Sequence, residues 1–210
     1  VAGYGSNGVS KLRLWQAKAP SFDMSSFNAG NYNTAISQSA SAELISKILY
    51  PNDNHTEGKI LRLLQQYFFS AASIADILQN HLNQYGTLDN LADKIAIQLN
   101  DTHPTVAIPE MMRILLDECS YEWDAAFDIC RKVFAYTNHT VMSEALEKWN
   151  ADIFRNTLPR IWQIVCEMDR RCRADLAKAF PGDQGKIDYM AIIGDNQVRT
   201  ANICAYTCHA

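Results

Sequence analysis

Two stretches of the chain decide the fold: Lys94-Ile95-Ala96-Ile97-Gln98-Leu99 and Lys132-Val133-Phe134-Ala135-Tyr136-Thr137. The first apolar run ends in Asn100-Asp101-Thr102-His103-Pro104, and the second ends in Asn138-His139-Thr140. A segment with helical spacing follows each polar loop. In an open α/β sheet, ligands bind outside the carboxyl ends of the strands. These two runs therefore predict a crevice built for a ligand rich in hydroxyl groups.

The bulk composition is that of an ordinary globular protein. The chain has 210 residues, of which 48% are hydrophobic and 20% are charged, and its net charge is −4. This length allows one large domain or two small ones. The absence of a basic block argues against nucleic-acid binding. We find no signal peptide and no apolar run long enough to span a bilayer, so we expect no membrane partner. The six cysteines form no CxxC pair. Since no secretory signal is found, we expect a reducing cytoplasm.

The clearest helical patterns lie on both sides of the two apolar runs. The predicted helix Thr56–Tyr85 is expected to stop at Gly86, because glycine is typical just after the C-terminal end of a helix. The predicted helix Asp152–Phe180 is expected to bend or break at Pro159. The predicted helix Tyr32–Leu49 has Ile36, Leu44 and Ile48 on one face. The predicted helices are Tyr32–Leu49, Thr56–Tyr85, Ala107–Glu118, Asp124–Lys132 and Asp152–Phe180.

Other segments carry weaker patterns. Imperfect alternation predicts a strand over Leu12–Ala17, and Lys186–Ile193 is predicted to be a third strand before a turn at Gly194-Asp195-Asn196. Phe22–Gly30 is expected to be a loop or a short helix, and Glu144–Trp149 a short helix. The final segment is helical or extended. The resulting order β-α-α-β-α-α-β-α-α implies an α/β fold, rich in helix, with a parallel sheet and helical crossovers.

The residues alone leave several chemistries open. His103, His139 and Asp101 could bind a metal in a hydrolase, but nothing resembles HExxH, and a loop histidine more often forms hydrogen bonds. His103 could also act with Asp101 in acid/base chemistry. The chain has no GxSxG, GxGxxG or P-loop motif. The residue pattern therefore allows either an enzyme or a sugar-binding module.

Two further sets of polar residues could reach such a crevice. Asp53 and Asn54 lie in a Pro-Asn-Asp-Asn turn before a helix, where local turn and capping bonds are the ordinary interpretation. Glu144 and Glu147 follow His139 and are three residues apart. Carboxylates and amides suit sugar hydroxyls because they accept or donate hydrogen bonds in defined directions.

Several strings, in this order and spacing, resemble the α-glucan phosphorylase family, which includes the glycogen, starch and maltodextrin phosphorylases. The resemblance covers nearly all of the chain. The strings are Arg13-Leu14-Trp15-Gln16-Ala17-Lys18-Ala19-Pro20, Leu49-Tyr50-Pro51-Asn52-Asp53-Asn54, Gly58-Lys59-Ile60-Leu61-Arg62-Leu63, Gln98 to Pro104, Ala135-Tyr136-Thr137-Asn138-His139-Thr140, Glu144-Ala145-Leu146-Glu147-Lys148-Trp149, Leu158-Pro159-Arg160 and Phe180-Pro181-Gly182-Asp183.

The resemblance implies a fold and an activity. It implies that residues 1–210 are part of the N-terminal domain of a two-domain glycosyltransferase fold of the B type. Family members cleave terminal α-1,4-glucosidic bonds with phosphate and release glucose 1-phosphate. Their pyridoxal phosphate works through its phosphate group, so the protein supplies positioning and electrostatics.

The resemblance also assigns roles to individual residues. His139 resembles the histidine whose main-chain carbonyl faces the sugar and favours positive charge on its ring. Asp53 resembles a residue that orders the catalytic site near the cofactor, and Asn54 the asparagine that contacts the reacting glucose. The remaining substrate-binding residues implied by the resemblance are Asp101, His103 and Glu147. No metal ligand is implied.

We expect the chain to be a piece of a longer protein. The family's upstream glycine-rich loop and its C-terminal domain, which carries the cofactor lysine, are missing from this sequence. We therefore expect no pyridoxal phosphate bound to this piece and no activity of the piece alone. The parent is expected to be a cytoplasmic homodimer that binds α-1,4-glucan and phosphate. The alternative is a non-catalytic carbohydrate-binding or scaffold domain of the same fold. We also expect the piece to self-associate through exposed apolar surface.

Overall fold

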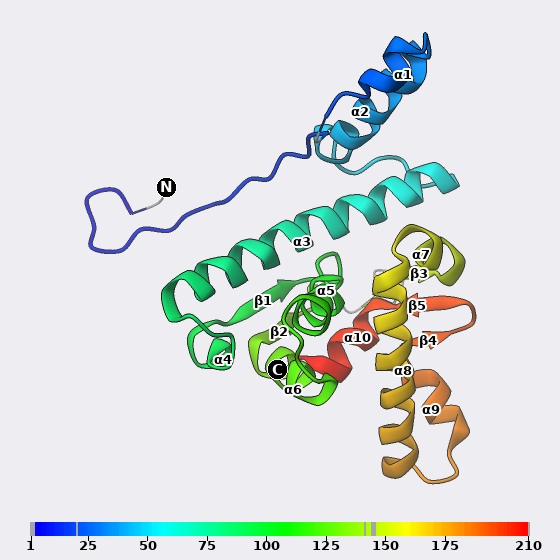
Figure 1. The fold of residues 1–210 in the computed structure, drawn as a ribbon. Helices are drawn as coiled ribbons and strands as arrows, with labels where there is room; N and C mark the ends of the chain where they lie inside the picture. The colour runs from blue at the N-terminus through cyan, green and yellow to red at the C-terminus, as the bar shows by residue number, and fades with distance from the viewer. Residues whose placement is uncertain (1–2, 20, 141, 144–145, 210) are drawn as a thin grey trace. The chain divides into compact units, whose positions relative to one another are not determined.

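The computed structural model describes residues 3–19, 21–140, 142–143 and 146–209 (Figure 1). The chain divides into two compact units, residues 1–65 and 66–210. Helix α3 (Thr56–Tyr85) contributes residues to both units and has the bounds predicted from the sequence. It ends at Gly86, whose φ of 73° is the left-handed conformation that terminates many helices.

The first unit begins with an extended segment. The predicted strand over Leu12–Ala17 is wrong, because this stretch pairs with no strand among the described residues. Leu12 and Leu14 are each 84% exposed, so their alternation marks no buried sheet face. The backbone N–H of Ala17 instead donates to the hydroxyl of Ser46 at 2.9 Å.

Two helices follow this segment in the first unit. Phe22–Gly30 was predicted to be a loop or a short helix, and it contains the short helix α1 (Met24–Asn28). Helix α2 (Tyr32–Lys47) confirms the helix predicted over Tyr32–Leu49 and ends two residues earlier than predicted. The predicted apolar face of α2 is not covered, since Ile36 is 57% exposed, Leu44 is 41% exposed and Ile48, its C-cap, is 66% exposed.

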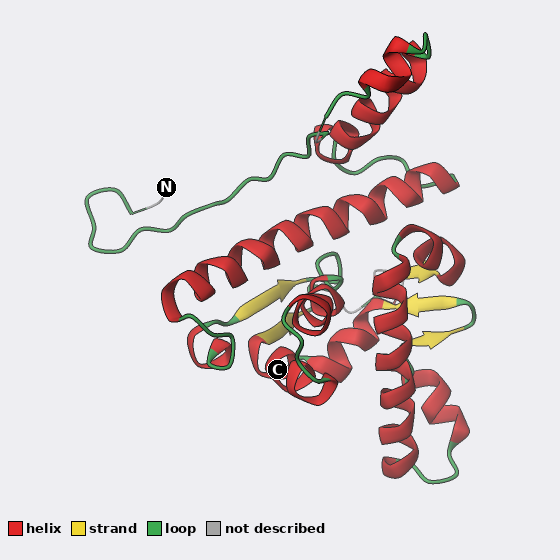
Figure 2. Cartoon of the chain, viewed as in Figure 1, coloured by secondary structure: helices red, strands yellow, loops and turns green. Residues whose placement is uncertain are grey.

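The second unit is built around two parallel strands. Strand β1 (Ile97–Asn100) follows the short helix α4 (Leu91–Lys94), and strand β2 (Phe134–Thr137) pairs with β1 in parallel (Figure 2). The chain crosses between them through α5 (Ala107–Arg113), a π-helical turn η1 (Ile114–Glu118) and α6 (Trp123–Val133). The parallel pairing with a helical crossover is therefore confirmed.

The two crossover helices differ in burial: α6 buries one side, whereas six of the seven residues of α5 are buried. In α6 the buried residues Ala126, Ile129, Cys130 and Val133 recur at helical spacing, which explains why this helix was readable from sequence. Helix α5 packs against α6 and against the later helix α8 (Pro159–Ala179). The core between these elements includes residues of both strands, with Leu99 and Phe134 almost fully buried.

The long helical segment after residue 150 breaks at the predicted proline. Helix α7 (Ala151–Thr157) is capped by the side chain of Asn150, which accepts from the N–H groups of Asp152 and Ile153 at 3.0 Å. Helix α8 (Pro159–Ala179) then starts at Pro159, where the missing N–H costs no helical hydrogen bond.

A small antiparallel sheet, in the order β3-β5-β4, replaces the predicted third parallel strand. Its strands are β3 (Lys148–Asn150), β4 (Ile193–Gly194) and β5 (Gln197–Arg199). The predicted short helix over Glu144–Trp149 is wrong at Lys148 and Trp149, which belong to β3, while residues 144–145 lie outside the described residues. The turn at Asp195 and Asn196 is confirmed, and both residues have φ near 55°, as a two-residue hairpin turn of type I′ requires.

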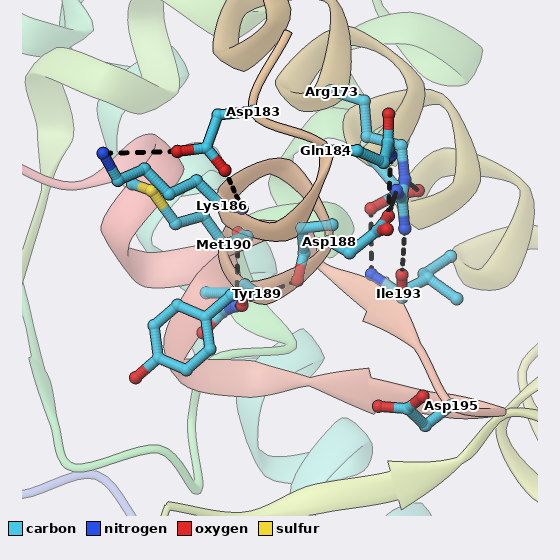
Figure 3. A network of polar contacts seen from close by, with 12 residues as sticks. Arg173, Asp183, Gln184, Lys186, Asp188, Tyr189, Met190, Ile193 and Asp195 are labelled. Carbon is cyan, nitrogen blue, oxygen red and sulfur yellow. Dashed lines mark hydrogen bonds and ion pairs between the residues drawn. The ribbon is translucent and has the colours of Figure 1, made fainter. Parts of the chain in front are cut away.

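Most of the segment Lys186–Ile193 is helix α9 (Gln184–Met190), contrary to the predicted strand. The side chain of Asp183 caps this helix by accepting from the N–H of Lys186 at 3.0 Å (Figure 3). Arg173 of α8 binds Asp188 and the carbonyl of Ile193, at 2.8 and 2.5 Å. The cap from Asp183 and the contacts of Arg173 thus favour a helix in this segment, although its composition is typical of a strand.

The final segment forms helix α10 (Thr200–Thr207), which packs against α6 and β2. Immediately after it, His209 forms an isolated parallel bridge with Ala135 of β2. The ring nitrogen Nδ1 of His209 also lies 3.0 Å from the carbonyl oxygen of Arg131. The backbone therefore returns to the edge of β2 on the side away from β1.

Candidate functional site

The parallel pairing brings the two predicted loops to one edge of the sheet. Asn100 lies opposite Thr137 in the register of β1 and β2. The N–H of Asp101 donates to the carbonyl of Thr137 at 2.9 Å, which continues the pairing by one residue. The loops that start at Asp101 and at Asn138 therefore leave the sheet side by side. This is the edge at which open α/β sheets bind ligands.

Side chains tie the two loops together at this edge. The Nε2 atom of His139 forms a hydrogen bond with Oδ1 of Asn100, and the Gln98 amide donates to the Thr137 hydroxyl at 2.5 Å. Asn100, His139 and Thr137 are exposed. The imidazole of His139 is thus occupied within the protein, whereas among the described residues we find no donor to its main-chain carbonyl oxygen.

The loop after β1 has a constrained backbone. Asp101 has a φ of 74°, a left-handed conformation that aspartate tolerates better than most residues. Its carboxylate accepts from the N–H of Thr102 at 2.7 Å. His103, two residues on, is half-buried in the same turn. A non-glycine residue held in this conformation is typical of functional loops, since the fold must offset the local cost.

Buried hydroxyl groups lie beneath this edge and were not singled out from the sequence. The hydroxyls of Thr102 and Tyr136 are buried with no hydrogen-bond partner among the described residues. Burial, together with the nearby groups of Cys204 and Asp101, raises the pKa of Tyr136 to about 12, so its phenol stays protonated. Tyr136 sits inside an apolar strand pattern, and no sequence signal separates it from a packing residue.

Glu147 is held by two other parts of the second unit. The side-chain amide of Gln66 in α3 donates to both carboxylate oxygens, at 3.0 and 3.1 Å. The main-chain carbonyl of Glu147 accepts from the hydroxyl of Thr200 at 2.6 Å and from its N–H at 3.3 Å. Glu147 also lines a cavity of about 420 Å³. Further residues lining this cavity are Lys148, Tyr189, Asp195, Arg199 and Asn202.

The loop that carries Asp53 and Asn54 belongs to the first unit. Asp53 accepts from Arg62 at 2.7 Å, and the N–H of Asn54 donates to the side chain of Asn52 at 2.9 Å. Gly58 is required here, because a β-carbon at this position would overlap the carbonyl oxygen of Asn52. The local turn expected from the sequence is present, and the Asn54 side chain is exposed. The convergence of Asp53 and Asn54 with the loops of the second unit stays a prediction.

No group of three or more His, Cys, Asp or Glu residues suited to a metal ion occurs in the part of the chain that the structure describes. Within the same residues, none of the helices combines the length and the apolar character needed to cross a bilayer.

The fold and the paired loops define an α/β protein with polar loops at the ends of two parallel strands. Comparison with known proteins identifies the family. The model of the carbohydrate phosphorylase family matches residues 1–210, and the chain belongs to this family.

Relatives with known names agree with this membership. The chain is 44% identical to the glycogen phosphorylase of Chlamydia trachomatis over 204 residues, which is 97% of this chain. It is 45% identical to the muscle form of glycogen phosphorylase of Ovis aries over 219 residues, covering the whole chain, and 44% identical to the brain form of Rattus norvegicus over 222 residues. The chain spans about a quarter of the length of these relatives, 25% to 26%.

Proposed function

We propose that this chain contributes part of the glucan-binding crevice of an α-1,4-glucan phosphorylase. The enzyme would cleave terminal α-1,4-glucosidic bonds with phosphate and release glucose 1-phosphate. The observation that carries the proposal is the meeting of Asn100-Asp101 and Asn138-His139 at one sheet edge, in a chain that belongs to the carbohydrate phosphorylase family. We further infer that the chain is part of the N-terminal domain of a glycosyltransferase fold of the B type.

The proposed roles follow from hydrogen-bond chemistry. Asp101, His103, Glu147 and Asn54 would accept from or donate to the hydroxyl groups of the terminal glucose. Asp53, held by Arg62, would keep the Asn54 loop in order. His139 would act through its main-chain carbonyl, whose partial negative charge favours positive charge developing on the sugar ring. The bond between its ring and Asn100 supports this role, because the imidazole is already occupied.

Pyridoxal phosphate belongs to this proposal only for the parent enzyme, where it would supply the acid that exchanges a proton with phosphate. The residues of this chain do not fit the group, because a Schiff base requires a sheltered lysine amine and every lysine of the chain is exposed. We therefore assign no cofactor-binding residue here and derive no step through the cofactor.

The proposal extends to assembly and location. The exposed apolar face of α2, formed by Ile36, Leu44 and, at its end, Ile48, supports a homodimer, since faces of this kind are usually covered by a partner. The six cysteines are free thiols, in keeping with a reducing cytoplasm.

The test is an assay of phosphorolysis with the full-length gene product and with residues 1–210 alone. We expect the full-length protein to release glucose 1-phosphate from maltoheptaose and phosphate, and the piece to show no turnover above a blank. In the full-length protein, Asp101→Asn should lower kcat/KM, whereas Asp93→Asn, an exposed change before β1, should not. A full-length protein that binds maltoheptaose but never cleaves it would favour the alternative, a non-catalytic carbohydrate-binding domain.

A further inference from the structure

Glu147 is fixed by contacts that the proposed sugar pocket does not itself require. Its main chain is anchored to Thr200 at the start of α10, and its carboxylate is bound by Gln66 of α3. Gln66 and Glu147 are 81 residues apart in the sequence. The main-chain anchor sets where the residue lies, and the amide of Gln66 sets where its carboxylate points.

The position of Gln66 on α3 is set by a hydrogen bond of the next residue, Tyr67. The next residue, Tyr67, donates its hydroxyl to the carboxylate of Glu110 at 2.8 Å, and Glu110 is 2% exposed. This buried bond fixes the rotation of α3 about its axis at the turn that carries Gln66. The Nε2 atom of Gln66 then meets both oxygens of Glu147 at nearly equal distance, 3.0 and 3.1 Å. The carboxylate is therefore held in one orientation before any ligand arrives.

We propose that Gln66 is a positioning residue that orients the carboxylate of Glu147 for the hydroxyl groups of the glucosyl unit. This inference rests on the proposed function. A carboxylate has about four lone-pair sites, so a bridging amide and ligand hydroxyls can bind it together. An amide donor also leaves the negative charge of Glu147 in place, and hydrogen bonds to a charged acceptor are the stronger ones.

Orientation in advance should improve binding because less side-chain freedom is lost when the ligand arrives. Without the amide, the carboxylate of Glu147 loses a donor that both of its oxygens share, while its main chain stays bound to Thr200. The loss should therefore appear in kcat/KM for the glucan and leave the fold intact. We expect a loss of about tenfold, the equivalent of ~1.4 kcal/mol.

The experiment uses the full-length gene product and maltoheptaose as the probe. Gln66→Met removes the donor and keeps the length of the side chain, and Gln66→Glu places a second carboxylate against Glu147. Gln79→Met is the matched control, because Gln79 lies on the same helix, is exposed, and donates its amide to exposed Asn83 at 2.9 Å. We expect kcat/KM to fall about tenfold in Gln66→Met and further in Gln66→Glu, with no change in Gln79→Met.

A double-mutant cycle with Glu147→Gln separates positioning from a structural role. If Gln66 acts through the carboxylate, Gln66→Met should have no further effect when Glu147 is already changed. Additive losses, or a Gln66→Met variant equal to the Gln79→Met control, would overturn the inference while the proposed function stands. A wild-type protein without phosphorolysis would overturn both. If Gln66→Met fails to fold, Gln66→Glu, which keeps size and polarity, serves in the same cycle.

Discussion

The buried carboxylate of Glu110 should be the most sensitive polar position in the second unit. Its side chain is 3% exposed and accepts from Arg113 at 2.8 and 2.9 Å and from Tyr67 at 2.8 Å. Burial and the bond to Glu110 raise the pKa of Tyr67 to about 12. These contacts join α3 to α5, so Glu110→Ala removes a link between two helices. The phenol of Tyr67 loses its acceptor, and the guanidinium of Arg113 loses one of its two carboxylate partners.

The magnitude follows from what each partner retains. Breaking a buried ion pair by removing one member costs about 3–5 kcal/mol. Arg113 keeps its bond to Glu118 at 2.8 Å and is 24% exposed, which places the cost near the lower end. We therefore expect Glu110→Ala to lower the free energy of unfolding by about 3 kcal/mol. Glu110→Gln should cost about half as much, since an amide keeps the volume and one acceptor oxygen.

The assay is urea unfolding followed by circular dichroism and tryptophan fluorescence, with the slope m checked for constancy. Asp117→Ala is the matched control: it removes the same charge from a pair with Arg160 whose side chains are 32% and 46% exposed. An exposed pair of this kind contributes at most about 1 kcal/mol. If Glu110→Ala costs no more than Asp117→Ala, the buried link between α3 and α5 does not stabilise the unit as argued.

Three further outcomes are expected. Gly58→Ala should destabilise the chain by about 2 kcal/mol, because the new β-carbon displaces the backbone at Asn52; thermal unfolding equal to wild type would contradict this. The hydrogen bond from Arg170 lowers the pKa of Glu167 from 4.5 to about 2. The ionised carboxylate of Glu167 therefore contributes fully to the free energy of unfolding above pH 4.5, and this contribution is lost as the pH falls toward 2. Urea unfolding of Glu167→Gln should accordingly depend less on pH in that window than wild type does. Residues 1–210 should self-associate in light scattering at high concentration, and changing Ile36 and Leu44 together to Glu should reduce it; a monomeric wild type would refute the role of this face.

The elements whose pattern is local could be predicted from the amino-acid sequence. Helix α3, the crossover helix α6 and the break at Pro159 were all readable, because helical spacing, caps and proline act within a few residues. The two strands were readable as apolar runs that end in polar loops, and their parallel pairing followed from the helices between them. The family was readable for the same reason, since its strings lie in order along the chain.

Features that depend on a partner distant in the sequence became visible only in the folded chain. Leu12–Ala17 has a strand-like alternation but no neighbouring strand, and Lys148–Asn150 becomes a strand only because β5 lies beside it. The segment Lys186–Ile193 is mostly helical because Asp183 caps it and Arg173 binds its far end. The bond between Gln66 and Glu147 joins positions whose proximity no local pattern can encode, since the fold alone brings α3 to that carboxylate.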